Sequence, residues 1–396
     1  MKVLLDSRAV ASIVRTLVLT STFGARAAFA QHGAPPNLPP VKFDLVRPVT
    51  IPMRMFDQTR PGVEAMINGR GPYLFAIETG GPYSIVLDAK VAAALQLKPP
   101  SGGADPVRSI ESLQIGPLSL HNVAAFVRDG TGLAGVDGML GLAMFKEVLL
   151  TVDYPRRQVR LERDSLPAAN GRDVIPLIHA GTGGMLIGVQ SDFAGKPVQL
   201  VIDTQGGTTI MCNPDAAEEF PFVAAAVGSG QASIGGAGGP GVTVTSARLK
   251  GDARFGGVTL QRPIVNVVPI PLECIIGTEL LANFSTTLDQ KTMRARFVGN
   301  PVVPPTPSQY TVGVSVAPDS SGAFRVRVVR PGSAADAAGI HVGDEVVEVD
   351  GKPAGLETAG PSMLRMLAAT GRSIRFKVRR DGRTVDIAVK PRLTIE

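Results

Sequence analysis

Two short apolar runs, each ended by an acidic residue and a turn, stand out in the pattern of hydrophobic and polar positions along this chain. The first run, at 75–77, leads into Glu78, and the second, at 200–202, leads into Asp203. A Thr follows each acid, and the Gly residues after it permit the positive φ angles of a sharp reversal. The pattern therefore predicts two buried strands, each of which presents one carboxylate at its end.

The pattern after each acid is also repeated. An apolar pair ends at Gly141 in the first half and at Gly277 in the second, and an Asp follows 12 positions later, at Asp153 and at Asp289. The distance from acid to Gly differs, with 63 positions in the first half and 74 in the second. We therefore expect two similar lobes and place the extra residues of the second lobe in the Gly-rich run at 228–241.

Composition agrees with a mostly β chain of more than one domain. The 396 residues are enough for two or three cores of ordinary size. Hydrophobic residues make up 44% of the chain and aromatic residues 5%, and there are 45 Gly and 32 Pro. Such a composition favours many short strands joined by turns.

The N-terminal segment is typical of a secretory signal peptide. Residues 1–30 place basic residues before an apolar stretch and end in a small-residue motif, although Arg15 interrupts the apolar stretch. The alternative is a disordered or membrane-anchored N-terminus. After signal removal we expect a soluble periplasmic or secreted protein without a membrane span. The Pro-containing residues 31–44 are expected to be a disordered spacer.

Charge and motifs argue against several function classes. The net charge is +6, but the basic residues are scattered and form no block, so we do not expect a nucleic-acid partner. The chain has no zinc-protease motif, no serine nucleophile elbow and no Cys cluster, and its four His residues are isolated. We therefore expect no metal and no cofactor.

With these features the chain resembles the retropepsin-like and pepsin-like aspartic proteases over roughly residues 45–298. In that family each lobe carries a hydrophobic-Asp-Thr-Gly turn and a later apolar strand that ends in Gly and crosses beneath the turn. The resemblance implies two pseudo-symmetric β-barrel lobes, at 45–163 and 172–298. Because both acids lie on one chain, a monomer is sufficient to complete the site.

The resemblance also implies the roles of the turn residues. Glu78 and Asp203 are the candidate catalytic pair, and five further residues support the turns: Thr79, Gly80, Thr204, Gln205 and Gly206. The chain departs from the family at both turns. Glu78 stands where the family has Asp, and Gln205 stands where the family has Gly.

A pair of facing carboxylates is the minimum apparatus for acid/base hydrolysis of a peptide bond. One acid must hold a proton because two close negative charges repel each other, and the ionised acid then activates water. We predict an exported aspartic-type endopeptidase acting on polypeptides. The alternative is a catalytically inactive peptide-binding scaffold, because the longer Glu78 and the added Gln205 side chain both disturb the turns.

Two further expectations follow from the family layout. One of the strand regions 109–115 and 121–127 should supply a hairpin that covers the cleft. The strands that carry Cys212 and Cys274 should be neighbours, and an oxidising compartment would allow these residues to pair. A disulfide and two separate buried thiols both remain open.

The C-terminal part is set apart by a Pro-rich linker at 299–309 and resembles the PDZ domains of exported bacterial proteases over 310–393. The ordered turns of 326–351 carry this resemblance. It implies a small α+β barrel that binds polypeptide C-termini beside Val312, Gly313 and Val314. The alternative is a PDZ domain that only packs on its own protease lobes.

Overall fold

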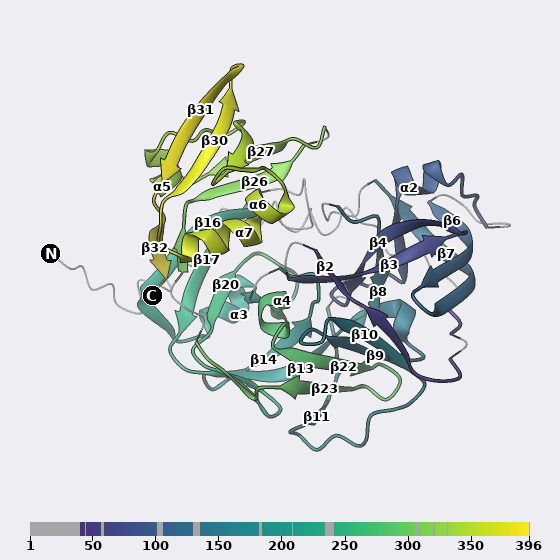
Figure 1. Cartoon of the computed structure of the whole chain (residues 1–396). Helices are drawn as coiled ribbons and strands as arrows, with labels where there is room; N and C mark the ends of the chain where they lie inside the picture. The colour runs from purple at the N-terminus through teal and green to yellow at the C-terminus, as the bar shows by residue number, and fades with distance from the viewer. Residues whose placement is uncertain are drawn as a thin grey trace.

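The computed structural model describes most of the chain after residue 39 (Figure 1). The described residues are 40–43, 45–56, 59–100, 106–129, 135–181, 184–207, 209–233, 241–305, 309–319, 321–330 and 332–395. The predicted signal peptide and most of the predicted spacer lie outside them. The prediction of a mostly β fold is confirmed, and no helix among the described residues is long and apolar enough to cross a membrane.

Lobe 1 is built on a seven-stranded sheet, drawn in purple and blue in Figure 1. Its strand order is β2-β3-β4-β8-β5-β7-β6. The strands are β2 (Arg54–Phe56), β3 (Arg60–Ile67), β4 (Arg70–Glu78), β5 (Ile85–Asp88), β6 (Val107–Ile115), β7 (Leu118–Arg128) and β8 (Gly138–Gly141), with the helices α2 (Ala89–Ala94) and η1 (Leu142–Phe145). Burial alternates along the second half of β3, and the last apolar residues of β4, Phe75 to Ile77, are all buried.

Lobe 2 repeats this plan with a larger sheet. Its strands are β12 (Ile178–Ala180), β13 (Leu186–Phe193), β14 (Lys196–Ile202), β15 (Ile210–Cys212), β16 (Phe222–Ser233), β17 (Gly241–Leu249), β18 (Ala253–Phe255), β19 (Val258–Leu260), β20 (Ile264–Val267), β21 (Cys274–Ile276) and β24 (Val302–Val303), with the helices α3 (Pro214–Glu218) and α4 (Thr278–Leu281). In both lobes the acid-bearing strand runs parallel to the later apolar strand: β4 pairs with β8, and β14 pairs with β21.

A six-stranded sheet joins the two lobes. Its order is β1-β10-β9-β22-β23-β11, from β1 (Val49–Pro52), β9 (Leu149–Asp153), β10 (Gln158–Glu162), β11 (Val174–Pro176), β22 (Phe284–Asp289) and β23 (Arg294–Gly299). At its centre Thr151 of β9 is opposite Thr287 of β22, and their hydroxyl oxygens are 2.9 Å apart. Because these residues are equivalent in the repeat, the pseudo-twofold axis passes between them.

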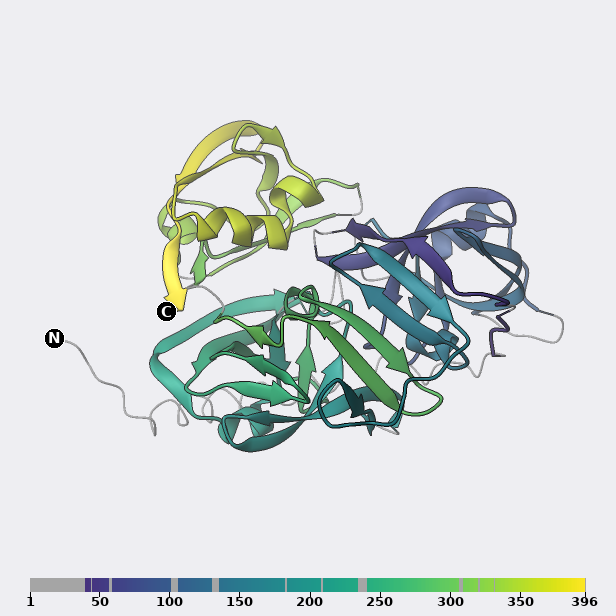
Figure 2. The ribbon, with the colours of Figure 1, turned by 60° about the horizontal axis from the view of Figure 1, so that its bottom comes forward.

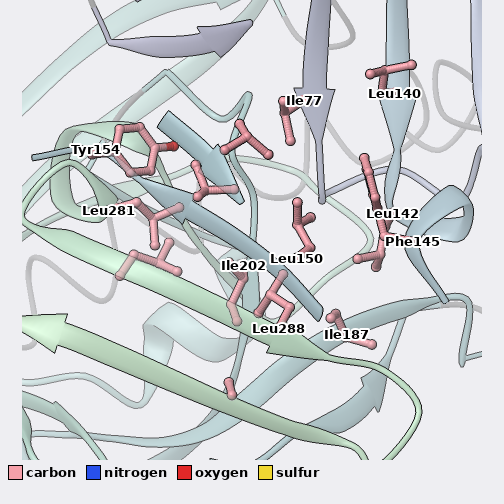
Figure 3. Close-up of a cluster of buried hydrophobic side chains, with 14 of the residues drawn as sticks. Ile77, Leu140, Leu142, Phe145, Leu150, Tyr154, Ile187, Ile202, Leu281 and Leu288 are labelled. Carbon is pink, nitrogen blue, oxygen red and sulfur yellow. The ribbon is translucent and has the colours of Figure 1, made fainter. Parts of the chain in front are cut away.

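One continuous apolar core runs through both lobes beneath the acid-bearing strands. Figure 3 shows part of it, with Ile77 and Leu140 from lobe 1 and Ile202 and Leu288 from the second half of the chain. Close packing of this kind fixes the strands that position the acids.

The C-terminal domain, drawn in yellow-green in Figure 1, has its own core. Its sheet has the path β26-β27-β28-β30-β31, with β29 beside β28, and the strands β25 and β32 pair separately. The elements are β25 (Gln309–Thr311), β26 (Val314–Pro318), β27 (Phe324–Val329), β28 (Glu345–Val349), β29 (Lys352–Pro353), β30 (Ile374–Arg380), β31 (Arg383–Val389), β32 (Arg392–Ile395), α5 (Ala334–Ala337), α6 (Leu356–Ala359) and α7 (Pro361–Ala369). Strand β32 packs beside β16 and β17 of lobe 2 (Figure 2). Part of the predicted linker is also paired, because β24 runs parallel to β19.

In lobe 1 the hairpin that was expected to cover the site is part of the sheet. Strands β6 and β7 are joined through the turn at Gly116 and are built into the lobe 1 sheet through β3 and β5. A Cβ on Gly116 would lie 3.6 Å from Ile51 of β1, so the turn lies against the six-stranded sheet. A hairpin that extends beyond its sheet belongs to lobe 2, where residues 241–244 of β17 pair with β16 but not with β20. Its tip, at 234–240, lies outside the described residues.

The two cysteines form a disulfide. Cys212 of β15 lies opposite Cys274 of β21 and is bonded to it. Lobe 1 has Leu87 opposite Gly138 at the corresponding place. A Cβ on Gly138 would lie 2.3 Å from the buried ring of Phe75. At equivalent positions, the Phe75 ring packs over Gly138 in lobe 1 and the disulfide joins two strands in lobe 2.

Candidate active site

The two acids lie at corresponding ends of equivalent strands. Glu78 is the last residue of β4 and is opposite Gly141 of β8. Asp203 directly follows β14, and its backbone N–H donates to the carbonyl of Ile276 at 3.1 Å. Parallel pairing with the apolar strand therefore holds both backbones at the point where each acid projects, as the repeat predicted.

The two threonines bind each other's turns across the junction between the lobes. The Thr79 hydroxyl donates to the carbonyl of Ile202 at 2.7 Å and accepts from the Thr204 N–H at 3.0 Å. Reciprocally, the Thr204 hydroxyl donates to the carbonyl of Ile77 at 2.5 Å and accepts from the Thr79 N–H at 3.1 Å. Both side chains are buried. These bonds fix the distance between the turns.

The next residue of each turn binds the acid of its own lobe. The Gly80 N–H donates to Glu78 Oε1 at 2.6 Å, and the Gln205 N–H donates to Asp203 Oδ1 at 2.7 Å. Gln205 therefore occupies the position equivalent to Gly80. A Cβ on Gly206 would lie 3.0 Å from Asp203 Oδ2, so the backbone is close to the carboxylate there as well.

Both carboxyl groups lie against Gly80, whose N–H bonds to Glu78 and whose Cα lies beside the Asp203 carboxyl group, and each acid shifts the pKa of the other. Burial raises the pKa of Glu78 well above its ordinary value, and the charge of Asp203 raises it further. Burial also raises the pKa of Asp203, but hydrogen bonds from the N–H groups of Gln205 and Gly206 and the bond from Glu78 oppose the rise. The pKa values of both acids are therefore raised, and the pair shares one proton over the range in which it titrates.

Arg60 adds a positive charge that the sequence patterns did not indicate. It begins β3, is half-buried, and its Nε donates to the carbonyl of Gln205 at 3.0 Å. Its charge lowers the pKa of both Glu78 and Asp203. A Cβ on Gly207 would lie 2.6 Å from Arg60 Nη2, so the bare backbone of the second turn makes room for the guanidinium.

Tyr154 is a second residue that the sequence patterns did not single out. It follows β9 and is buried in the core cluster that also contains Ile77 and Ile202 (Figure 3). Burial raises the pKa of its hydroxyl well above the ordinary value, and the charges of Asp203 and Glu78 raise it further. The hydroxyl has no hydrogen-bond partner among the described residues. Its place in the Val-Asp-Tyr segment of the repeat was the only signal available.

The Gln205 side chain turns away from its own lobe. Its Nε2 donates to the carbonyl of Ile77 at 2.6 Å and to that of Pro61 at 3.2 Å. The side chain is buried, and its Oε1 has no partner among the described residues. Gln205 thus binds the backbone of β3 and of β4, the strand that carries Glu78.

The predicted peptide-binding residues lie apart from the acids, in the C-terminal domain. Val312 is buried, and Gly313 has a positive φ of 84°. The Gly313 N–H donates to the Thr311 hydroxyl at 3.1 Å. Val314 begins β26, the terminal strand of its sheet, whose second edge has no strand partner among the described residues.

Other candidate sites are few among the described residues. No group of three or more His, Cys, Asp or Glu side chains gathers there as metal ligands would. Of two surface hollows, one of about 490 Å³ lies between Gly135 and the C-terminal domain, and one of about 340 Å³ lies on lobe 2 near Glu273. Neither is lined by Glu78 or Asp203.

Comparisons with known proteins identify the C-terminal domain. The family model of the PDZ domain matches residues 325–380. No curated protein matches the chain in sequence.

Three solved structures are similar in part. The aspartic proteinase from Irpex lacteus is 13% identical, covers 64% of this chain and 97% of its own, and has a TM-score of 0.41. A retropepsin-like aspartic protease from Rickettsia conorii is 16% identical over 29% of this chain and 89% of its own, with a TM-score of 0.22. The HtrA3 PDZ domain bound to a phage-derived ligand is 23% identical over 21% of this chain and 85% of its own, with a TM-score of 0.19.

Proposed function

We propose that this chain is an exported aspartic-type endopeptidase whose PDZ domain binds polypeptide C-termini. The observation that carries the proposal is the reciprocal bonding of Thr79 and Thr204, which holds the carboxyl groups of Glu78 and Asp203 within reach of each other. Both acids come from one chain, so a monomer is sufficient. The predicted signal peptide is the basis for proposing export to the periplasm or the medium.

In the proposed reaction the ionised Asp203 is the general base. It removes a proton from a water molecule, whose oxygen attacks the carbon of the peptide carbonyl. Glu78, which holds the proton, donates it to the carbonyl oxygen as that oxygen gains negative charge. The difference in pKa between the two acids supports this division of roles.

When the tetrahedral intermediate collapses, each acid returns to its starting protonation state. The proton on Asp203 passes to the leaving nitrogen, the C–N bond breaks, and the new carboxyl group returns a proton to Glu78. The free amine and the acid are the products, and the pair returns to its starting state. No group outside the two carboxyls is required for this balance.

The PDZ domain is proposed to bind an extended peptide along β26. The open edge of this strand offers backbone N–H and C=O groups to an added strand, and the turn at Gly313 precedes that edge. Val314 packs against a core that includes Leu364 of α7. This arrangement is suited to a C-terminal segment with an apolar last side chain.

A second candidate function is a catalytically inactive peptide-binding scaffold. The observation that favours it is the buried Gln205 side chain, which occupies a turn position that is bare in lobe 1. In this alternative the acids only stabilise their turns, and the bound polypeptide is not cleaved.

Cleavage of an unfolded protein separates the two candidates. We expect the wild type to cut such a substrate in a pH range limited by the two acids, and a pepstatin-type inhibitor to block it. Assays from about pH 3 to about pH 8 cover the expected range. Absence of cleavage, together with retained peptide binding, would establish the scaffold instead.

Peptide binding by the PDZ domain is tested on the full chain. We expect a peptide with a free C-terminal carboxylate to bind more tightly than the same peptide with a C-terminal amide, because the loop N–H groups bind the charge. Titration calorimetry with both peptides measures the difference. Equal affinity for the two forms would contradict recognition of the C-terminus.

A further inference from the structure

The turns of the two lobes are related residue by residue. Each threonine binds the opposite turn in the same way, and the N–H of the following residue binds its own acid in both lobes. Gly80 and Gln205 are therefore equivalent in position, and only one of them carries a side chain.

At Gly80 the reason for glycine is steric. A Cβ there would lie 2.4 Å from Asp203 Cγ and 2.7 Å from each carboxylate oxygen. Carbon atoms that are not bonded do not approach so closely, so a side chain at position 80 would displace the carboxyl group of the opposite acid. A residue at this turn position thus faces the acid of the other lobe.

The pseudo-twofold axis transfers this relation to the second turn. By this symmetry we expect the Cβ of Gln205 to lie where the carboxyl group of an aspartate at position 78 would be. Glu78 is longer by one methylene, about 1.5 Å. Its Cγ passes over a bare part of its own turn, where a Cβ on Gly81 would lie 3.3 Å away.

We propose that Glu78 and Gln205 are a matched pair, in which the side chain at 205 requires a glutamate at 78 to bring the carboxyl group to the shared site. The proposal deepens the proposed function and rests on it for its effect on turnover. Gln205 acts as a positioning residue, because its amide also bonds to the carbonyls of Ile77 and Pro61 and so holds the strand that ends in Glu78. The two departures from the Asp-Thr-Gly pattern compensate for each other.

A set of variants at the two positions tests the proposal. Glu78→Asp alone places the shorter acid against the Cβ of Gln205, and we expect turnover to fall by about 100-fold, the cost of a displacement of about 1 Å. Glu78→Asp with Gln205→Gly removes the obstructing atom, and we expect turnover at least about 10-fold above that of Glu78→Asp alone. Gln205→Gly alone leaves Glu78 without its support and should also lower turnover.

Gln205→Ala is the matched control, because it keeps the Cβ and removes the amide. We expect Glu78→Asp with Gln205→Ala to stay as slow as Glu78→Asp alone. Rescue by Ala as large as rescue by Gly would overturn the proposal, as would a double variant whose loss is the product of the two single losses.

Two further measurements keep the test independent of proteolysis. Urea unfolding of the same variants should show the same rescue pattern in stability, since the crowding exists without substrate.

The mirror change is made in the other lobe: Gly80→Ala should displace Asp203, and Gly80→Ala with Asp203→Glu should recover part of the lost stability. If the wild type cleaves nothing but both stability cycles show rescue, the proposed function fails and the matched pair stands. Additive losses in both cycles would overturn the matched pair whatever the activity.

Discussion

The two acid-bearing turns share one backbone plan and differ in how their space is filled. The first turn combines a long acid, Glu78, with the bare Gly80, and the second combines a short acid, Asp203, with the filled position Gln205. The equivalent hydrogen bonds keep the two carboxyl groups together, while the unequal surroundings give them different pKa shifts. A pseudo-symmetric backbone therefore does not require the same acidic residue in both turns.

The largest effect is expected from removing the proposed general base, Asp203. Asp203→Asn keeps the size of the side chain but removes the proposed base, and we expect peptide cleavage to fall by about 1,000-fold or more. The measurement is the initial rate on an unfolded protein substrate. Asp173→Asn, at an exposed position between the lobes, is the control and should leave the rate unchanged. Unaltered cleavage by Asp203→Asn would mean that the reaction does not use this pair.

The disulfide distinguishes the lobes in stability. Replacing Cys212 and Cys274 together by Ala removes a bond between residues 62 positions apart, and we expect a loss of about 2–5 kcal/mol in the free energy of unfolding. Urea unfolding measures it, and the wild type in reducing agent should show a similar loss. An unchanged midpoint would show that packing alone holds lobe 2, as Phe75 over Gly138 does in lobe 1.

The threonine bonds test whether the turns are equivalent. Thr79→Val and Thr204→Val each remove a buried hydroxyl and leave a carbonyl and an N–H without that partner, so each should cost about 1–3 kcal/mol. Chemical unfolding of both variants and of the double variant measures the loss. We expect equal single losses and a double loss smaller than their sum, because both variants break the same network. Clearly unequal losses of stability would mean that the two turns are not equivalent.

The raised pKa of Glu78 predicts a dependence of stability on pH. A carboxyl group whose pKa is raised on folding stabilises the folded state fully below its unfolded pKa, and this contribution is lost as the pH rises through the folded pKa. Glu78→Gln should therefore flatten the decline in stability above the ordinary glutamate pKa of 4.5. Unfolding at several pH values measures it, with the exposed Glu111→Gln as the control. A decline identical to that of the wild type would contradict the shift.

The smallest effect is expected at Arg60. Its charge lowers the pKa of both acids, so Arg60→Gln should raise both and move the pH profile of cleavage upward. The pH dependence of kcat/KM measures the shift, and Arg54→Gln on the neighbouring strand is the control. A downward shift would contradict this electrostatic role.

The repeat made the main features of the site predictable from sequence. Glu78 and Asp203 stand at the ends of apolar runs with the same later spacing, which is the length of the short helix and strand that follow β8 and β21, η1 with β9 and α4 with β22. The pKa shifts of the two acids were not predictable, because they depend on burial and on N–H groups that gather only in the fold. Arg60 gave no local signal, and Tyr154 gave only its place in the repeat, since their interactions with the acids come from tertiary packing.

The position of the covering hairpin was not predicted correctly from the layout of the family. The regions at 109–115 and 121–127 form a hairpin, but β3 and β5 incorporate it into the lobe 1 sheet. The hairpin that extends beyond its sheet is formed by β16 and β17 of lobe 2, in the region to which the extra residues were assigned. Alternation predicts a strand, but the neighbour of that strand depends on chain segments far away in sequence. The expected domain boundaries remain predictions.

The pairing of β9 with β22 has a consequence for the order of synthesis. Thr151 leaves the ribosome well before Thr287, which lies 136 positions later. Until that second strand arrives, a newborn chain presents an open sheet edge at the middle of the future molecule, and open edges invite pairing with other chains. A late fold, after the whole polypeptide has been delivered, protects this edge.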